Sequence, residues 1–274
     1  TEGSLRDIML TTRFNMSGEI ESPNTKFSAN LNGATITADP KWPSIEKINA
    51  KVNFSNDYLK IVGNQASVEG IDLSYLSITT RDFNQPDSTL SLNARFNSES
   101  LIIEDFIKKS SVSEKIKAYL EEFELKGKLW GNVNMVVPTQ RDNDQKLKLS
   151  FDMFASDNSL SVLDGKLKID EFNSQISYSD GLIRTKGKGL IGQELFQILL
   201  NPKDWIDEQK PGLRVKLSHL ETATDAYISK NLNGQWNSSI NSENLNANVS
   251  IFLDDKGKLM VSLADLNVSS IDSI

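Results

Sequence analysis

Apolar and polar residues alternate along most of the chain with a period of two residues. The alternation is strict in Ile48–Phe54 and Leu90–Phe96, and it returns in Lys146–Met153 and Leu213–Leu217. A period of two is that of a β-strand with one face buried and the other in water. The pattern therefore predicts a chain built mostly of half-buried strands, about 15 in number.

Short segments rich in Asn, Asp and Gly separate these strands at intervals of roughly 8 to 15 residues. Asn32-Gly33, Asp164-Gly165 and Asn233-Gly234 are examples. Such pairs favour tight hairpins because Asn, Asp and Gly accept a positive φ. The spacing predicts an antiparallel meander rather than βαβ units. No strict repeat is visible, although a loose unit of several strands and an insertion recurs.

Two segments depart from the alternation. In Glu99–Phe123, apolar residues fall at helical spacing, and Ser110–Val112 interrupts them, which predicts two short amphipathic helices. In Gln193–Trp205, four apolar residues precede Asn201-Pro202, a stop signal for a helix. The second segment fits a helix and equally a strand that ends in a turn.

Strands of this kind present one continuous apolar face, which requires a cover. About 25 helical residues span roughly 38 Å, whereas a sheet of about 15 strands is roughly 70 Å wide, so the helices cannot cover it. Two solutions remain. Either the sheet closes on itself as a sandwich, or its apolar floor is open to a ligand.

Composition excludes several function classes. The 274 residues carry a net charge of -7, with lysines interleaved among acidic and amide side chains, so no nucleic-acid partner is expected. Without cysteine there is no disulfide, thiolate metal site or cysteine nucleophile. His219 is the single histidine and lies in register with Leu213, Val215 and Leu217, so a metal site is not expected. Catalytic motifs are missing too, which predicts neither an enzyme nor a cofactor.

Three groups of short motifs follow one another in the chain. Trp42-Pro43 leads into the strand Ile48–Phe54, Leu125–Pro138 combines a glycine strand with an apolar-Pro ending, and Gly165–Ile169 begins the next part. In this order the motifs resemble the YhdP-type proteins of the AsmA-like superfamily, over roughly residues 20–200. Thr139 follows Pro138 where that family usually has Leu, and about the last 70 residues show strand patterning without a recognisable motif.

The resemblance implies a large envelope protein of Gram-negative bacteria. Such a protein lies in the periplasm, and an N-terminal helix outside this segment anchors it in the inner membrane. Its sheet curls into a long open groove that passes phospholipid acyl chains toward the outer membrane. No apolar run here approaches the roughly 20 residues of a membrane span, and both ends lie beside strand-like residues, which predicts a segment of a longer polypeptide.

The fold class expected is therefore mostly β: an elongated, twisted antiparallel sheet that forms an open apolar groove, with one or two short amphipathic helices. Residues 1–274 are expected to form one continuous groove segment, with a soft internal boundary near residues 138–144. The function expected is a lipid-transfer module that shelters phospholipid acyl chains. The alternative is a structural scaffold of the envelope, closed as a sandwich or solenoid, that binds other envelope proteins at its edges.

The candidates for the groove floor are the apolar residues that alternate with polar ones along the predicted strands, and which therefore share one face of the sheet. They are Ile48, Ala50, Val52, Phe54, Leu90, Leu92, Ala94, Phe96, Leu129, Val133, Met135, Val137, Leu147, Leu149, Phe151, Met153, Leu213, Val215 and Leu217. Gly127 and Gly131 share the parity of Leu129, so each either leaves room on the floor or forms a bulge. Trp130 has the opposite parity and is expected to pack on the outer face.

Overall fold

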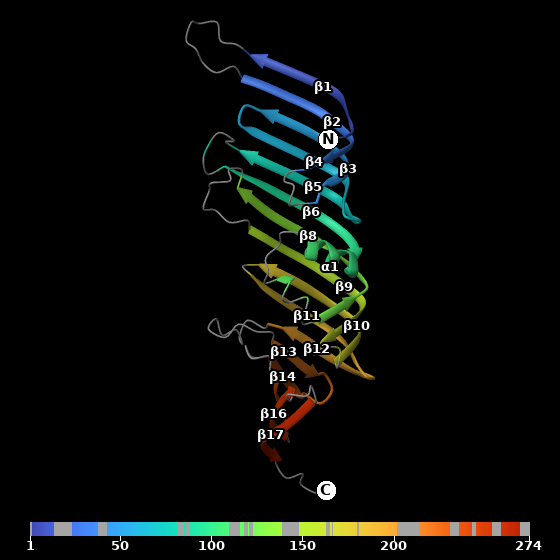
Figure 1. Ribbon diagram of the computed structural model, residues 1–274, viewed down its shortest axis with the longest axis vertical. Helices are drawn as coiled ribbons and strands as arrows, with labels where there is room; N and C mark the ends of the chain where they lie inside the picture. Colours follow the sequence, from blue (N-terminus) through green and yellow to red (C-terminus); the bar gives the residue numbers. More distant parts are fainter. Residues whose placement is uncertain are drawn as a thin grey trace. The chain divides into compact units, whose positions relative to one another are not determined.

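The computed structural model describes residues 2–13, 24–37, 43–81, 85, 88–109, 116–117, 120, 123–138, 148–162, 165, 167–179, 181–201, 214–230, 236–242, 245–253 and 259–268. Within these residues, 17 strands belong to one open, twisted sheet with antiparallel pairing (Figure 1). Helix α1 spans Ser100–Lys109, and residues 116, 117 and 120 are also helical. The expected mostly-β fold, with helix between residues 99 and 123, is confirmed.

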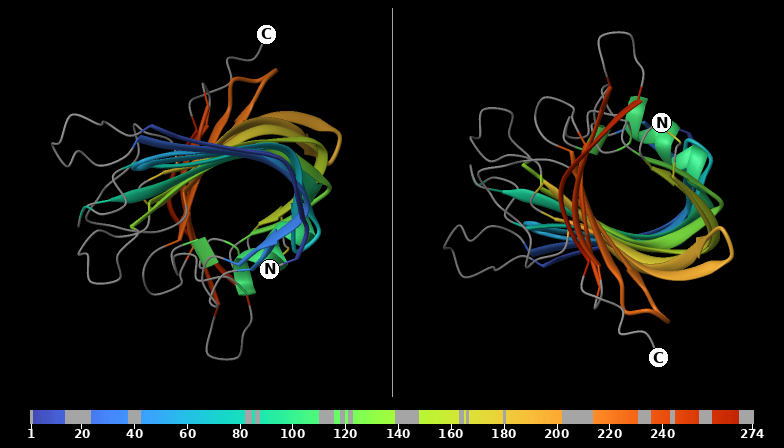
Figure 2. Two further views of the ribbon diagram at one scale, coloured as in Figure 1. Left: turned by 90° about the horizontal axis from the view of Figure 1, so that it is seen from above. Right: turned by 90° about the horizontal axis from the view of Figure 1, so that it is seen from below.

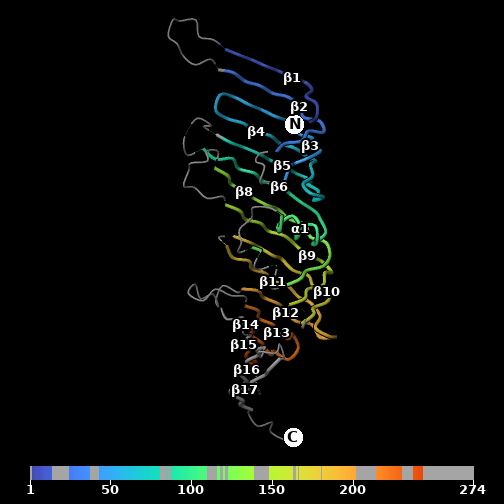
Figure 3. The backbone as a smooth tube through the Cα atoms, viewed as in Figure 1, coloured from blue at the N-terminus to red at the C-terminus, as the bar shows by residue number. Residues whose placement is uncertain are grey.

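The chain divides into two compact units. The first comprises Thr1–Ser113, Lys128–Met153 and Tyr178–Asp180, and the second comprises Glu114–Gly127, Phe154–Ser177 and Gly181–Ile274. In both, consecutive strands run up and down beside each other, as the backbone trace shows (Figure 3). The long strand β9 contributes residues to each unit.

The first unit contains α1 and seven complete strands, paired in the order β1-β2-β3-β4-β5-β6-β8. They are β1 (Ser4–Arg13), β2 (Asn24–Ile36), β3 (Ile45–Ser55), β4 (Tyr58–Val68), β5 (Ile71–Arg81), β6 (Thr89–Glu99) and β8 (Lys128–Pro138). Strands β1 to β6 bend in the same sense (Figure 2). Helix α1 follows β6 directly and packs at the end of these strands, where Ile102 lies beside the β4–β5 turn at Gly70.

In the second unit, the short strand β7 (Phe123–Lys126) pairs with the end of β9 (Lys148–Val162). The later strands from β11 to β17 pair in chain order. The strands after β9 are β10 (Leu167–Ser179), β11 (Leu182–Ile191), β12 (Glu194–Leu200), β13 (Arg214–His219), β14 (Asp225–Lys230), β15 (Trp236–Asn241), β16 (Leu245–Leu253) and β17 (Leu259–Val268).

The ambiguous segment beginning at Gln193 is a strand, not a helix. β12 pairs with β11 on one side and β13 on the other. The buried Asn201 ends it, because its side-chain Nδ2 donates to the Ile183 carbonyl at 2.7 Å and its Oδ1 accepts the Arg214 N–H at 3.1 Å. The helical interpretation failed because pairing with two neighbouring strands overrides a weak local periodicity. Residues 202–205 lie outside the described part.

Several strands contain one residue with positive φ, and in β1 and β3 the register with a neighbouring strand shifts at that residue. Lys47 in β3 has φ 53°, and Glu171 in β10 has φ 49°. An extra residue of this kind is a β-bulge, which bends the strand and increases its twist. In β3 the bulge at Lys47 also changes which alternate residues face the core. The alternation that begins at Ile48 therefore describes only the part of the strand after the bulge. The bulges therefore supply curvature to the sheet.

The structure reveals a repeat that the sequence pattern alone does not display. Gly3, Ala34, Asn49 and Gly63 have counterparts in Gly127, Asn158, Asn173 and Gly187, each 124 residues later. A Cβ added at Gly3 would contact Ala34, and one at Gly127 would contact Asn158. At Gly63 it would meet Asn49 and Ala50, and at Gly187 the equivalent Asn173 and Ser174. Strands β1 to β6 thus correspond to β8 to β13.

Candidate functional site

Cross-strand pairing gathers the apolar residues of the first unit into rows that run across its strands. The middle row consists of directly paired residues on β2, β3, β4, β5, β6 and β8: Ala29, Val52, Ile61, Ile78, Leu92 and Met135. Directly opposed residues of an antiparallel pair point to the same face. Six neighbouring strands therefore present an unbroken apolar row.

A second and a third row flank the middle one on the same face. Toward the bulges lie Leu31, Ala50, Gly63, Leu76, Ala94 and Val133, and toward the other strand ends lie Phe27, Phe54, Leu59, Thr80, Leu90 and Val137. The three rows, called here the first-unit apolar face, contain no charged residue. Thr80 is their one polar side chain.

Burial divides the first-unit apolar face and its extensions into two zones. Near the bulges and α1, the predicted residues Ile48, Ala50, Ala94, Phe96 and Leu129 are buried. Farther along the strands, partly exposed side chains predominate, although Ala29, Ile61, Ile78 and Thr80 are buried there; the partly exposed ones are Val52, Phe54, Leu90, Leu92, Met135, Val137, Leu149 and Phe151. On β8 and β9, Val133 and Met153 are partly exposed too. The apolar face is therefore mostly buried at one end of the strands and partly exposed at the other.

Strand β9 continues this face beyond β8. A Cβ at Gly131 would lie 2.9 Å from the Cβ of Met153, so these two residues share a side of the sheet. Leu149 and Phe151 have the same parity as Met153, and the Phe151 ring stacks on Tyr178 with centroids 5.3 Å apart. The structure thus brings Phe54, Leu92, Val133, Leu149 and Phe151 to one face.

The other predicted floor residues lie in the second unit or outside the described part. Val215 and Leu217 are buried and pair with Leu200 and Ile198 on β12. Leu147 and Leu213 lie outside the described residues. Trp130 has the outward parity expected and its side chain is exposed.

Side-chain amides stabilise the bulges that frame the face, and the sequence pattern did not identify them. Asn49 Oδ1 accepts the N–H of the positive-φ residue Gly33 at 3.0 Å. In the repeat, Asn173 Oδ1 accepts the N–H of Asp157, also of positive φ, at 3.1 Å. The sequence did contain a signal for these amides: an Asn follows an apolar residue at Asn49 and again at Asn173, 124 residues later.

The chemistry on this face is that of apolar contact. The described residues contain no group of His, Asp or Glu arranged to hold a metal ion. None of the helices described is long and apolar enough to cross a membrane. What the arrangement offers a ligand is apolar surface across several strands.

A family model described as YhdP protein matches residues 12–273. The chain belongs to the YhdP family. Comparisons with individually described proteins and with solved structures gave no match. The YhdP match is longer than the motifs suggested, since it includes about the last 70 residues, where alternating strands carry no short motif.

Membership of the YhdP family and the open sheet agree with each other. In both units the glycines at Gly63 and Gly187 let neighbouring strands approach closely, because any side chain there would meet the next strand.

Proposed function

We propose that this segment is a lipid-transfer module, and that phospholipid acyl chains lie on the first-unit apolar face. The observation that carries the proposal is the unbroken middle row, with partly exposed apolar residues along one side. Apolar surface left in water costs roughly 25 cal/mol per Å². A monomeric protein seldom leaves so extensive a face uncovered unless a ligand or partner uses it.

The dimensions of this face suit an acyl chain. Strands β2, β3, β4, β5, β6 and β8 follow one another at about 4.8 Å, so six strands extend across about 24 Å. One leaflet of the hydrocarbon core of a bilayer is about 15 Å thick. An acyl chain lying along the rows therefore has apolar contact over its whole length, and each methylene contributes about 0.8 kcal/mol.

Membership of the YhdP family supports a proposal for the cellular setting. The full-length protein is proposed to lie in the periplasm, to be anchored in the inner membrane by a segment outside residues 1–274, and to move phospholipid between inner and outer membrane. Partners in the envelope are part of the same proposal. The scaffold alternative requires a covering sheet over the apolar face, and a single open sheet does not favour it.

Lipid extraction tests the proposal. The purified chain should carry phospholipid detectable by mass spectrometry, and Leu92→Asp should reduce the amount because it places a charge in the middle row. Ser91→Asp is the matched control, since the neighbouring residue points to the outer face. Lipid-free parent protein, or equal lipid in both variants, would argue for the scaffold.

A further inference from the structure

The first-unit apolar face contains one polar side chain, Thr80, which has no hydrogen-bond partner among the described residues. Thr80 lies on β5 and pairs with Leu59 on β4 and with Leu90 on β6. It is 4% exposed, and its Oγ1 atom is buried without a bond. A buried hydroxyl of this kind is unfavourable, because it has lost its bonds to water and gained none in return. Thr80 therefore marks a position at which a bonding partner is expected.

The position of Thr80 on the face distinguishes it from other buried hydroxyls of the first unit. Ser98 and Ser100 also carry a buried oxygen without a partner, but they lie where β6 passes into α1, at the end of the strands where the face is mostly buried. Thr80 belongs to the row toward the opposite strand ends. The other members of that row are all partly exposed: Phe27, Phe54, Leu59, Leu90 and Val137. A ligand on this row therefore meets open apolar surface on both sides of Thr80.

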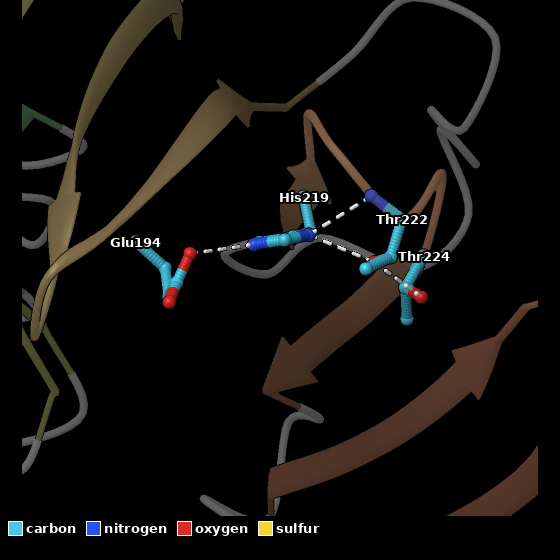
Figure 4. Close-up of polar contacts among 4 residues, drawn as sticks. All are labelled: Glu194, His219, Thr222 and Thr224. Carbon is cyan, nitrogen blue, oxygen red and sulfur yellow. Dashed lines mark hydrogen bonds and ion pairs between the residues drawn. The ribbon is translucent and has the colours of Figure 1, made fainter.

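The polar cluster around His219 in the second unit is, by contrast, bonded internally (Figure 4). The backbone N–H of Thr222 donates to His219 Nδ1 at 3.1 Å, so the proton of the neutral ring is on Nε2, which donates to Glu194 Oε2 at 3.2 Å. The Glu194 side chain is 61% exposed, and water solvates the rest of its carboxylate. This cluster is satisfied without a ligand, whereas Thr80 is not.

The ligand group that suits Thr80 is an uncharged hydrogen-bond acceptor. A hydroxyl without a partner can donate its proton, and the ester carbonyl oxygens that join the tails of a phospholipid to its glycerol can accept it. A phosphate oxygen also accepts, but its charge makes burial beside Leu59 and Leu90 far more costly. The ester carbonyl is also the acceptor nearest to the tails, so it can reach the apolar row while the headgroup stays in water.

The two leucines beside Thr80 control access to its hydroxyl. The threonine side chain is shorter than those of Leu59 and Leu90, so Oγ1 lies deeper in the row than their methyl groups. Both leucines are partly exposed, and exposed side chains change rotamer within nanoseconds. Such a change in either leucine opens the hydroxyl to a carbonyl oxygen.

We propose that the Thr80 hydroxyl donates a hydrogen bond to an ester carbonyl of a bound phospholipid. This assignment rests on the proposed lipid-binding function and adds to it the position of the ester end of the lipid. From Thr80 the tail crosses β4, β3 and β2 over Leu59, Phe54 and Phe27. Three strand spacings amount to about 14 Å, close to the roughly 15 Å of one leaflet of a bilayer core. The row thus accommodates a tail that begins at Thr80.

The binding of two probes to the purified chain tests this contact. Both are phosphatidylglycerols with the same tail length and the same fluorescent label, but the tails of one are joined by esters and those of the other by ethers, which lack the carbonyl. The ester lipid should bind about fivefold more tightly, the effect of one hydrogen bond between uncharged groups. Thr80→Val, which replaces the hydroxyl by a methyl group of similar shape, should abolish this preference, and Thr80→Ser should retain it.

Thr79→Val is the matched control. Thr79 is the neighbouring residue on β5 and pairs with Ser91 on the outer face, so this variant should keep the preference for the ester lipid. Equal binding of both lipids by the parent, or an unchanged preference in Thr80→Val, overturns the ester contact. If the parent binds neither lipid, the lipid-binding function itself fails.

The melting temperature of the delipidated proteins separates the contact from a structural role. Because the Thr80 hydroxyl has no partner without lipid, Thr80→Val should melt at or above the temperature of the parent. A lower melting temperature would mean that the hydroxyl is already bonded in the folded chain, and the proposal would then be wrong.

Discussion

At the scale of single residues, the close approach of neighbouring backbones determines which residue type is tolerated at several positions on the apolar face. Parity predicted that Gly131 either leaves room on the floor or forms a bulge. Its φ is not positive, and a Cβ there would lie 2.2 Å from the Asp152 carbonyl oxygen. The glycine therefore lets β9 lie close to β8. Sequence alone identified the position but not this reason, since the reason lies in a neighbouring strand.

Gly131→Ala should lower the free energy of unfolding by about 1 to 3 kcal/mol, because the strands must separate to admit the methyl group. Chemical denaturation measures the change. Asn132→Ala is the control: Asn132 is exposed on the opposite face of the same strand, so its replacement should change stability by less than about 0.5 kcal/mol. Equal effects would contradict the close approach.

The bulge amides provide a second residue-scale prediction. Asn49→Ala removes the acceptor for the Gly33 N–H and the donor to Gln65 Oε1 at 2.9 Å. The loss should be about 1 kcal/mol. Asn173→Ala, its counterpart in the repeat, should cost a similar amount. Lys51→Ala, an exposed change on β3, serves as the control. Thermal unfolding that leaves both asparagine variants at the parent temperature would refute this role.

At the scale of elements, the period of two identified strands reliably where a strand lies between two neighbours and has one wet face. Ile48–Phe54 and Leu90–Phe96 are of this kind. The spacing of apolar residues was ambiguous for β12, because Leu195, Phe196, Leu199 and Leu200 fit the helical period as well as the strand period. It could not place the bulges, because a positive φ at Lys47 or Glu171 has no signature in residue type. The parity of a strand is consequently predictable only on one side of its bulge.

The β13–β14 pair contains an ion pair with a predictable pH response. Lys216 Nζ lies 2.8 Å from Asp225 Oδ2 and 5.1 Å from the centroid of Tyr227. Burial disfavours the ionised carboxylate, but hydrogen bonds from Lys216 and Ser218 outweigh it and hold the pKa of Asp225 below its ordinary value. The hydrogen bond to Asp225, followed by that to Tyr227, raises the pKa of Lys216.

The directions of these two pKa shifts define the pH range in which the ion pair stabilises the fold. A lowered pKa of Asp225 gives stability above its unfolded value, about 3.9, that is lost as the pH falls below it. A raised pKa of Lys216 gives stability below about 10.4 that is lost as the pH rises past it. Asp225→Asn should therefore cost up to about 1 kcal/mol at pH 7, and the difference from the parent should disappear in acid.

Urea denaturation of parent and variant between acid and neutral pH measures this difference. Asp170→Asn is the matched control, because Asp170 pairs with Lys168 2.7 Å away and both side chains are well exposed, at 49% and 63%. Its effect should be smaller at every pH. A destabilisation of Asp225→Asn that is the same in acid as at neutral pH would rule out the ion pair as its cause.

At the scale of the whole molecule, strands β8 to β13 repeat the arrangement of β1 to β6. The two repeats share glycines, bulges and the amide at Asn49 and Asn173, whereas the floor differs, since Ala50 corresponds to Ser174. Sequence inspection found only a loose recurrence, because identical residues are sparse and the backbone geometry carries the similarity. The expected single groove segment over residues 1–274, with its soft boundary near 138–144, remains a prediction.

The two burial zones of the first-unit apolar face yield the last prediction. Leu76 is fully buried, and an unpaired charge there costs several kcal/mol, comparable to the 5 to 15 kcal/mol that keep a domain folded. Leu76→Asp should therefore unfold or aggregate. Val133 and Leu149 are partly exposed, so the carboxylate of Val133→Asp or Leu149→Asp can remain hydrated, and the melting temperature should change little.

Lipid passage should respond in the opposite way. An acyl chain that meets a charge at Val133 or Leu149 loses about 0.8 kcal/mol for each methylene no longer buried and must also displace the water around the carboxylate. In the full-length protein these variants should block phospholipid transport while remaining folded. Melting temperature and bound lipid must be measured on the same preparations. If Val133→Asp and Leu149→Asp unfold as Leu76→Asp does, the whole face is a sealed core and cannot carry lipid.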